Sequence, residues 1–240
     1  MDTIKINKGN AQIVAHRGLS GIERENTASA FVAAGNRSYF GIETDVRPTA
    51  DGHFVLLHDD NAVRCGGDMI LPEQSSLQTL QSVQLFERDG SRGRADLRIP
   101  TLQDYLRICK CYDKVCVLEF KGYFTEEQMA KALEIVKAEY TLDKMIFISF
   151  GIENLQILRA ICPEANCQFL TGRYDEELIK LLKDNKMDLD IWSGALTEEA
   201  QVKRLLDEGI KVNVWTVDDK DLAEKLISWG VQYITSNILE

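Results

Sequence analysis

The chain has 240 residues, of which 45% are hydrophobic and 28% are charged, and its formal net charge is −10. This length suits one large α/β domain and supports a sizeable hydrophobic core. The acidic balance argues against a broad nucleic-acid surface, which needs a basic face. It does not exclude a small anionic substrate, because the local charge of a pocket can oppose the global one.

The composition also bears on the compartment. Residues 1–12 are polar and no run of about 18 apolar residues occurs, so we expect neither a signal peptide nor stable membrane insertion. None of the six cysteines forms a C-x-x-C pair. We therefore expect reduced thiols and a cytoplasmic protein. Zinc at Cys109, Cys111 and Cys116 is disfavoured, because no second ligand pair has zinc-finger spacing.

Short apolar, β-branched runs recur along the chain and predict eight buried strands. They cover residues 11–15, 41–46, 114–120, 144–150, 166–170, 188–192, 210–215 and 231–235. The segment DGHFVLLHD (51–59) predicts a β-hairpin after the second of them.

Segments with helical spacing lie between most of these strands. One helix is expected after Thr125, an N-cap followed by Glu and Gln in the first turn. Another is expected to begin at Thr197 and to end at Gly209. A third starts at residue 218 or 219 and stops at Gly230.

Strands that alternate with helices of about 10–15 residues indicate βαβ units and a parallel sheet. Eight such strands predict an α/β fold of the (β/α)8 or TIM-barrel type. The rival doubly wound sheet normally carries a G-x-G-x-x-G turn after its first strand, and HRGLSG (16–21) lacks that spacing. Residues 60–100 are polar and rich in Gly, Gln and Ser. We expect them to form a small insertion after strand two, within a single domain over residues 1–240.

Carboxylates gather at the carboxyl ends of the predicted strands, where barrel enzymes hold their functional groups. Glu43 and Asp45 lie two residues apart, so both point into the barrel, and Glu119 lies near the end of the next barrel strand. Three converging carboxylates repel one another unless a cation intervenes. These hard oxygen ligands predict one divalent cation, Mg²⁺ or Ca²⁺. The alternative is that they cap helices or pair with Arg and Lys.

Basic and imidazole groups are expected at the same end. His16 and Arg17 end the first strand, and His58 ends the apolar run of the hairpin. Two imidazoles can divide general-base and general-acid work, whereas His53, inside the hairpin, is expected to be an ordinary surface residue. Arg17 and Lys121 supply positive charge for an anion.

Two tryptophans end the sixth and seventh strands, Trp192 and Trp215. They are either core residues or a flat apolar wall for a small organic group at the barrel mouth.

Six motifs, in order along the chain, resemble the glycerophosphodiester phosphodiesterase family. They are HRG (16–18), ENT (25–27), IETDVRPTADG (42–52), HD (58–59), LEFK (118–121) and VNVWTV (212–217). With GVQYITSN (230–237), the resemblance covers nearly the whole chain. It implies a (β/α)8 barrel with an insertion after strand two, and metal-dependent hydrolysis of a small glycerophosphodiester to an alcohol and glycerol 3-phosphate.

The resemblance also implies roles for single residues. It implies that the metal is held by Glu43, Asp45 and Glu119. It implies acid/base work for His16 and His58, phosphate contacts for Arg17 and Lys121, and a place in the substrate wall for Trp215.

The chain departs from the family pattern in three places. Arg24 precedes Glu-Asn-Thr where proline is common, which favours a more mobile loop. Ala62 and Val63 replace a bulkier apolar residue after the His-Asp pair, and the closing T-D-x-P pattern reads TSNIL (235–239), which predicts a reshaped last loop. These differences leave the headgroup open but remove no proposed catalytic residue.

The implied reaction starts with attack of the glycerol 2-hydroxyl on phosphorus. One histidine takes the proton of that hydroxyl and the other protonates the leaving alcohol, and the resulting cyclic phosphate is opened by water. The resemblance favours His16 as the base and His58 as the acid. One alternative is a lysophospholipase D-like enzyme for longer lipids, which an apolar insertion would favour. Another is a non-catalytic phosphate-binding barrel, which is expected to have lost a histidine or a carboxylate. Neither the headgroup nor the oligomeric state follows from the sequence.

Overall fold

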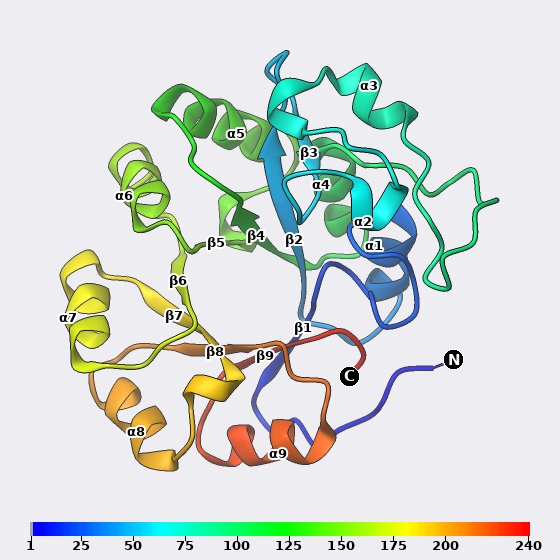
Figure 1. Ribbon diagram of the computed structural model, residues 1–240. Coiled ribbons are helices and arrows are strands. Elements are labelled where there is room, and N and C mark those ends of the chain that lie inside the picture. Colours follow the sequence, from blue (N-terminus) through cyan, green and yellow to red (C-terminus); the bar gives the residue numbers. More distant parts are fainter. Residues whose placement is uncertain (1) are drawn as a thin grey trace.

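A computed structural model describes residues 2–240. Eight parallel strands form a closed barrel with helices around it (Figure 1), which confirms the predicted (β/α)8 fold. They are β1 (Gln12–Ala15), β2 (Gly41–Pro48), β4 (Val115–Phe120), β5 (Met145–Ser149), β6 (Cys167–Thr171), β7 (Asp188–Trp192), β8 (Val212–Trp215) and β9 (Tyr233–Ser236). The barrel closes because β1 pairs in parallel with both β2 and β9.

The outer ring consists of the helices that connect these strands. They are α1 (Ala28–Gly35), α4 (Leu102–Cys111), α5 (Glu126–Glu139), α6 (Ile152–Ile161), α7 (Glu176–Asn185), α8 (Glu199–Asp207) and α9 (Lys220–Ser228), with 3-10 turns η2 (Leu142–Lys144) and η3 (Ser193–Ala195). Thr125 caps α5 and Asp219 caps α9, as predicted. The N-cap of α8 is Glu198, one residue after the predicted Thr197, and Gln201 Oε1 accepts from the backbone N–H groups of both residues.

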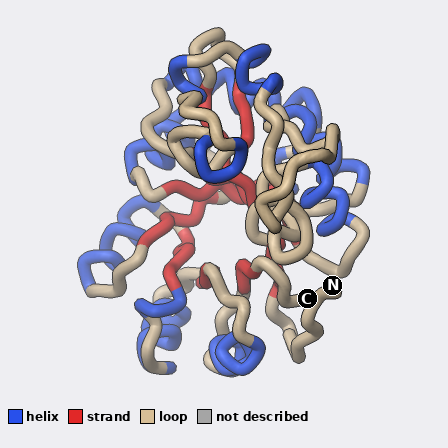
Figure 2. Tube along the Cα trace, turned by 45° about the vertical axis from the view of Figure 1, so that its right-hand side comes forward, coloured by secondary structure: helices blue, strands red, loops and turns tan. Residues whose placement is uncertain are grey.

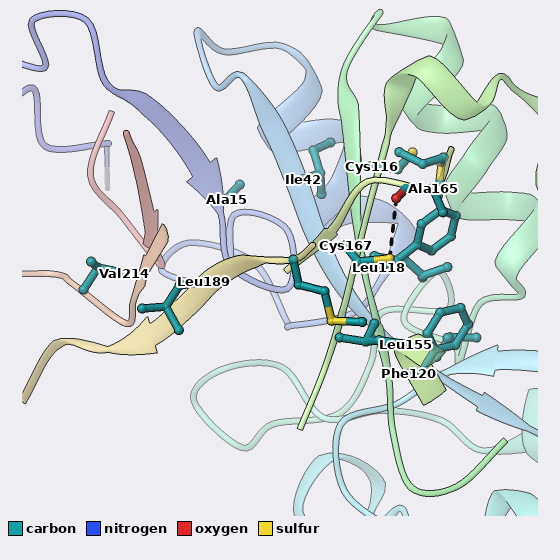
Figure 3. Packing of buried hydrophobic residues seen from close by; sticks show 14 of the residues in the cluster. Ala15, Ile42, Cys116, Leu118, Phe120, Leu155, Ala165, Cys167, Leu189 and Val214 are labelled. Atoms are coloured by element: carbon teal, nitrogen blue, oxygen red, sulfur yellow. Dashed lines mark hydrogen bonds between the residues drawn. The ribbon is translucent and has the colours of Figure 1, made fainter. Parts of the chain in front are cut away.

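The main core fills the space between strands and helices. Figure 3 shows members of this core, including Ala15, Ile42, Leu118, Leu189 and Val214, each from a different strand. A strand alternates its side chains between two faces. When these residues face the helices, their neighbours along each strand must face the barrel interior.

The barrel interior is apolar in its lower part. Val14, Val117, Ile146, Ile148 and Leu170 form a separate buried cluster there with other residues. Because Val117 faces inward, period-two alternation also turns the side chain two residues later on β4 toward the interior. The strand ends therefore deliver polar side chains to the mouth above an apolar floor.

The expected insertion follows β2. It begins with β3 (Phe54–Leu56), which pairs antiparallel with the end of β2 and confirms the hairpin, and continues with α2 (Val63–Gly66), η1 (Pro72–Gln74) and α3 (Leu77–Ser82). In Figure 2 this insertion appears as loops (tan) and short helices (blue) at one side of the barrel.

The insertion has a hydrophobic core of its own. We call this cluster the second core: Val55, Leu57, Ala62, Cys65, Leu80, Val83, Leu85, Leu97 and Ile99. Around β3, alternation sends Phe54 and Leu56 into the main core and Val55 and Leu57 into the second core. The strand is therefore a wall shared by the two cores.

Within residues 2–240, no helix is both long and apolar enough to cross a lipid bilayer.

Candidate active site

Three buried carboxylates meet at the barrel mouth. Glu43 and Asp45 project from β2, and Glu119 projects from β4, where it is the direct register partner of Asp45. One oxygen from each of the three residues lies within 4.8 Å of the other two. All three residues are buried, with exposed fractions of 3%, 0% and 7% for Glu43, Asp45 and Glu119. The structure thus brings together the three carboxylates that strand alternation singled out in the sequence.

The surroundings shift the pKa values of the three carboxyls in different directions. Burial, and then the nearby Asp45, raise the pKa of Glu43 well above its ordinary value. Burial and Asp45 also raise the pKa of Glu119 to about 8. Burial alone would raise the pKa of Asp45, but Arg17, Lys121 and His58 outweigh it and lower the pKa to about 2. Without a cation, the cluster therefore favours one ionised carboxylate, at Asp45, and protons on its neighbours.

Arg17 and Lys121 border the carboxylates, as predicted. The Arg17 backbone N–H donates to Glu43 Oε2 at 2.7 Å, and its Nε lies 3.5 Å from Asp45 Oδ2. Lys121 Nζ lies 2.8 Å from Glu119 Oε1 and 3.6 Å from Asp45 Oδ1. Both side chains line the same small cavity as the carboxylates Glu43 and Glu119.

Both predicted catalytic histidines line that cavity. His16 Nδ1 lies 2.8 Å from Asn237 Oδ1, and its Nε2 is 4.0 Å from Glu43 Oε2. His58 Nδ1 lies 2.7 Å from Asp59 Oδ1. Burial, together with Arg17, lowers the pKa of His16 to about 4, so the ring is neutral near neutral pH. The pKa of His58 is also lowered, chiefly by burial, whereas His53 is exposed and lies outside the cavity.

The Glu-Asn-Thr motif after β1 supports this site. Thr27 is the N-cap of α1, Asn26 Nδ2 donates to Asp45 Oδ2 at 2.8 Å, and Glu25 accepts from Arg17 at 2.9 Å. Arg17 and Asn26 have positive φ angles of 53° and 52°, a conformation that costs energy in residues other than glycine. The loop thus holds a strained backbone that directs Glu25 and Asn26 to two different site residues, while Thr27 anchors it to α1.

Gly18 shows why this loop can approach α1 so closely. Its φ is +75°, and a Cβ built on it would lie 2.7 Å from the Cβ of Ala30 and 2.8 Å from the Ala30 carbonyl carbon. Any side chain here would push the loop away from the helix.

The loop is also tied to the insertion, in contrast to the mobility expected from the missing proline. Arg24 Nε donates to the Phe86 carbonyl at 2.6 Å, and a second guanidinium nitrogen of Arg24 donates to the Glu87 carbonyl. Arg88 donates to the Gly21 carbonyl in the same region. Arginine therefore replaces the stiffness of proline with long-range hydrogen bonds.

The two tryptophans have different environments. Trp215 lines the cavity and makes an edge-to-face contact with Phe150, with ring centroids 5.6 Å apart. Trp192 does not line the cavity; it is 49% exposed, and its ring lies over Gly194. A contact between Trp192 and substrate stays a prediction, and it requires a substrate that extends beyond the cavity.

Two cavity residues were not singled out from the sequence. Phe150 follows β5 directly, and its ring contributes to the wall. Asp190, on β7, is 2% exposed, and its Oδ1 makes no hydrogen bond within residues 2–240. Burial, with a smaller effect of Glu119, raises the pKa of Asp190 well above its ordinary value. The inward-register rule that found Glu43 and Asp45 would also have found Asp190, two residues before a strand end.

The carboxylate cluster fits a divalent cation. Asp45 Oδ1 is buried and makes no hydrogen bond among the described residues, and it faces the oxygens of Glu43 and Glu119. Carboxylate oxygens are the preferred ligands of Mg²⁺ and Ca²⁺. A cation there would replace both the protons favoured on Glu43 and Glu119 and the present contact of Lys121 with Glu119.

Comparisons with known proteins agree with these observations. The model of the glycerophosphoryl diester phosphodiesterase family matches residues 16–239. A glycerophosphodiester phosphodiesterase of Caldanaerobacter subterraneus is 27% identical over 244 residues, which cover 94% of this chain and 93% of the relative. Glycerophosphodiester phosphodiesterase 1 of Rattus norvegicus is 28% identical over an alignment 262 residues long. This alignment covers 95% of this chain and 78% of the relative.

Solved structures show the same similarity. An Oleispira antarctica phosphodiesterase, solved in complex with the product sn-glycerol-3-phosphate, superposes with a TM-score of 0.89 at 26% identity and covers 97% of this chain and 95% of that one. A glycerophosphodiester phosphodiesterase from Parabacteroides distasonis has a TM-score of 0.78 at 27% identity, with 95% and 93% covered.

Proposed function

Because the chain belongs to the glycerophosphoryl diester phosphodiesterase family, we propose that it hydrolyses small glycerophosphodiesters to an alcohol and sn-glycerol 3-phosphate with one divalent cation. The chain is a phosphodiesterase. The observation that carries the finer proposal is the meeting of three carboxylates, two histidines and two cationic side chains at one mouth. A non-catalytic barrel has no need of three buried carboxylates that repel one another.

Glu43, Asp45 and Glu119 would hold the cation, Mg²⁺ or Ca²⁺. When bound, it supplies positive charge for the non-bridging oxygens of the phosphate as negative charge develops there. Arg17 and Lys121 supply further positive charge beside the cluster. A guanidinium also matches the geometry of two phosphate oxygens.

The two histidines move the protons. His16, neutral because of its burial, takes the proton of the glycerol 2-hydroxyl as that oxygen forms a bond to phosphorus. The bond from phosphorus to the leaving alcohol then breaks, and His58 gives that oxygen a proton. Water opens the cyclic phosphate with the proton transfers reversed, which returns both rings to their starting states.

Within residues 2–240, the three carboxylates form a single candidate metal site. With no evident second cation to activate water, attack by a hydroxyl of the substrate is favoured. Holding the hydroxyl beside phosphorus can be worth roughly 7–11 kcal/mol in favourable geometry. The test is a pair of glycerophosphodiesters with and without the 2-hydroxyl, assayed at saturating metal. We expect the first to turn over and the second to bind as an inhibitor with very slow turnover. Comparable kcat values would exclude the cyclic intermediate and favour direct attack by water.

The cavity bears on the size of the substrate. Its volume is about 40 Å³, and one water needs roughly 10–15 Å³ on this measure. It therefore suits a phosphate group rather than a whole diester, and the alcohol is expected to lie over the rim. The insertion that borders the rim is mostly polar, which favours a small water-soluble alcohol.

A longer lipid substrate has one observation in its favour. Tyr123, Phe150 and Trp192 follow or end strands at the mouth and are 69%, 50% and 49% exposed. A panel that compares glycerophosphoethanolamine and glycerophosphocholine with their lysophospholipids separates the two classes. Higher kcat/KM for the lysophospholipids would identify a lysophospholipase D-like enzyme.

Metal dependence is tested in the same assay. We expect EDTA to abolish release of glycerol 3-phosphate and added Mg²⁺ or Ca²⁺ to restore it. Full activity after exhaustive chelation would disprove a role for the cation.

A further inference from the structure

We propose that Asn237, held by Asp218, keeps His16 in the tautomer that carries its proton on Nδ1, so that Nε2 is free to accept a proton in the cavity. Asn237 and Asp218 are positioning residues in this proposal, because they act on the reaction through His16.

The first contact, taken alone, does not decide the tautomer. His16 Nδ1 and the Asn237 side-chain amide are 2.8 Å apart. An amide oxygen in this place would accept a hydrogen bond from a protonated Nδ1, whereas an amide NH₂ group would donate a hydrogen bond to an unprotonated Nδ1. The tautomer of His16 therefore depends on the orientation of the Asn237 amide.

Asp218 decides that orientation. The other end of the Asn237 amide lies 2.6 Å from Asp218 Oδ2. Because a carboxylate only accepts hydrogen bonds, this end must be the NH₂ group. The reversed amide would place its oxygen 2.6 Å from a carboxylate oxygen with no proton between them.

The Asp218 carboxylate is itself fixed in place. Its Oδ1 accepts from the Ser236 hydroxyl at 2.9 Å and from the Asn237 backbone N–H at 2.8 Å. A rotation that released the Asn237 amide would break both bonds. The last strand and the loop after β8 thus form one connected support for His16.

Ser20, like His16, would tolerate either amide orientation. Its hydroxyl lies 2.7 Å from Asn237 Oδ1 and 2.8 Å from the His16 carbonyl. The Ser20 hydroxyl can donate one hydrogen bond, to either of these two oxygens. Its oxygen could equally accept a hydrogen bond from the NH₂ group of a reversed Asn237 amide. Ser20 therefore does not oppose the orientation that Asp218 imposes.

The consequence is a division of labour between the histidines. With Nδ1 protonated, His16 presents an unprotonated Nε2, 4.0 Å from Glu43 Oε2. His58 instead faces a carboxylate through Nδ1, and Arg64 holds that carboxylate, Asp59. A carboxylate stabilises a positively charged ring better than a neutral amide does. His16 is thereby suited to begin as the base and His58 to begin as the acid.

This role explains the departure at the end of the chain from the family's T-D-x-P pattern. The segment TSN (235–237) places both Ser236 and Asn237 on the Asp218 carboxylate. The reshaping expected of this loop is therefore a set of contacts around Asp218, one of which reaches His16.

The tautomer can be measured without turnover by long-range ¹⁵N–¹H NMR of the imidazole nitrogens. The chain has only three histidines, so His53→Gln and His58→Gln assign the spectrum by loss of signals. Spectra are recorded on full-length protein, chelated and Mg²⁺-loaded, at a pH above the histidine range. We expect the His16 pattern of an Nδ1–H ring in the wild type. An Nε2–H pattern would overturn the proposal.

Asp218→Asn is the test variant. Its amide oxygen would still accept from the Asn237 backbone N–H, so its NH₂ group would face the Asn237 side chain and favour the reversed amide. We expect the His16 tautomer to shift toward Nε2–H and kcat to fall by about tenfold to a hundredfold, the range found for groups that orient metal-ligating histidines, with little change in KM. Asp221→Asn, an exposed change in the next helix, is the control and should alter neither. Unchanged tautomer and kcat in a folded Asp218→Asn protein would overturn the proposal.

The kinetic result rests on the proposed hydrolysis, whereas the tautomer does not. If the chain hydrolysed no glycerophosphodiester, the NMR spectra would still report whether Asn237 sets the His16 ring.

Discussion

Arg64 donates two hydrogen bonds to the Glu25 carboxylate, at 2.6 and 2.8 Å, and so joins the insertion to the loop after β1. The same guanidinium donates to both oxygens of Asp59, the partner of His58, and Glu25 accepts from Arg17. One side chain of the insertion therefore contacts the carboxylate partners of both His58 and Arg17, the residues for which acid/base work and phosphate binding are proposed.

We predict that Arg64→Ala lowers kcat about tenfold or more, because loss of a group that orients functional side chains typically costs this much. Arg107→Ala is a matched control, since Arg107 makes a similar two-pronged pair with Glu139 on the outer helices. Steady-state kinetics and thermal unfolding are measured on both. Equal losses of activity would mean that Arg64 has no special relation to the site.

The Glu25 pair predicts acid sensitivity. Burial would raise the pKa of Glu25, but Arg64 and Arg17 outweigh it and lower the pKa to about 2, from an ordinary 4.5. A carboxyl with a lowered folded-state pKa adds stability above its ordinary pKa and loses it as the pH falls through the folded value. Stability should therefore decline between pH 4.5 and about 2.

We expect Glu25→Gln to flatten this part of the pH–stability curve. Thermal unfolding at a series of pH values measures it, with the exposed Glu126→Gln as control. An identical acid decline in wild type and Glu25→Gln would show that other groups cause it.

The histidines give a sharp contrast. His58→Gln should lower kcat by about two to four orders of magnitude, the usual effect of losing an acid/base group. His53→Gln should change kcat little, because that ring is exposed and outside the cavity. Small and equal effects in both variants would refute the role assigned to His58.

Two neighbouring carboxylates should respond in opposite directions. In the chelated protein, Asp45→Asn removes the partner of Arg17 and Lys121 and should lower the free energy of unfolding by about 1–3 kcal/mol. Glu43→Gln should leave it unchanged or raise it, because the fold already favours the protonated form and Gln keeps an acceptor for the Arg17 N–H.

Denaturant unfolding in EDTA measures both variants, and calorimetry with Mg²⁺ or Ca²⁺ should show weaker binding in each. Crowding of like charges alone would predict unchanged or higher stability for both. Greater stability of Asp45→Asn would thus contradict the pairing of Asp45 with the cations.

The sequence predicted those parts of the site that follow from strand periodicity. The eight strands lie within two residues of the predicted runs, and Glu43, Asp45 and Glu119 converge because alternation fixes the face of each side chain. His16 and His58 were found because each directly follows an apolar run.

Contacts between loops could not be predicted in this way. Arg64 and Glu25 are 39 positions apart, and His16 and Asn237 are 221 apart. No local rule relates such residues, because their meeting depends on how the insertion and the last strand lie on the barrel. Asp190 was missed for another reason, since it lies inside the run DLDIW (188–192) and the rule was applied only to strand ends that also carry basic or imidazole groups.

The second core has a consequence for heat inactivation. His58 follows Leu57, a member of this small cluster. Glu43, Asp45 and Glu119 instead lie on barrel strands that share the much larger main core. A region with fewer buried apolar side chains opens at a lower free-energy cost than the whole fold. Amides of the insertion should therefore exchange with deuterium sooner than those of β2 and β4. Activity is then expected to be lost on warming while the barrel, and with it the three carboxylates proposed to hold the cation, is still intact.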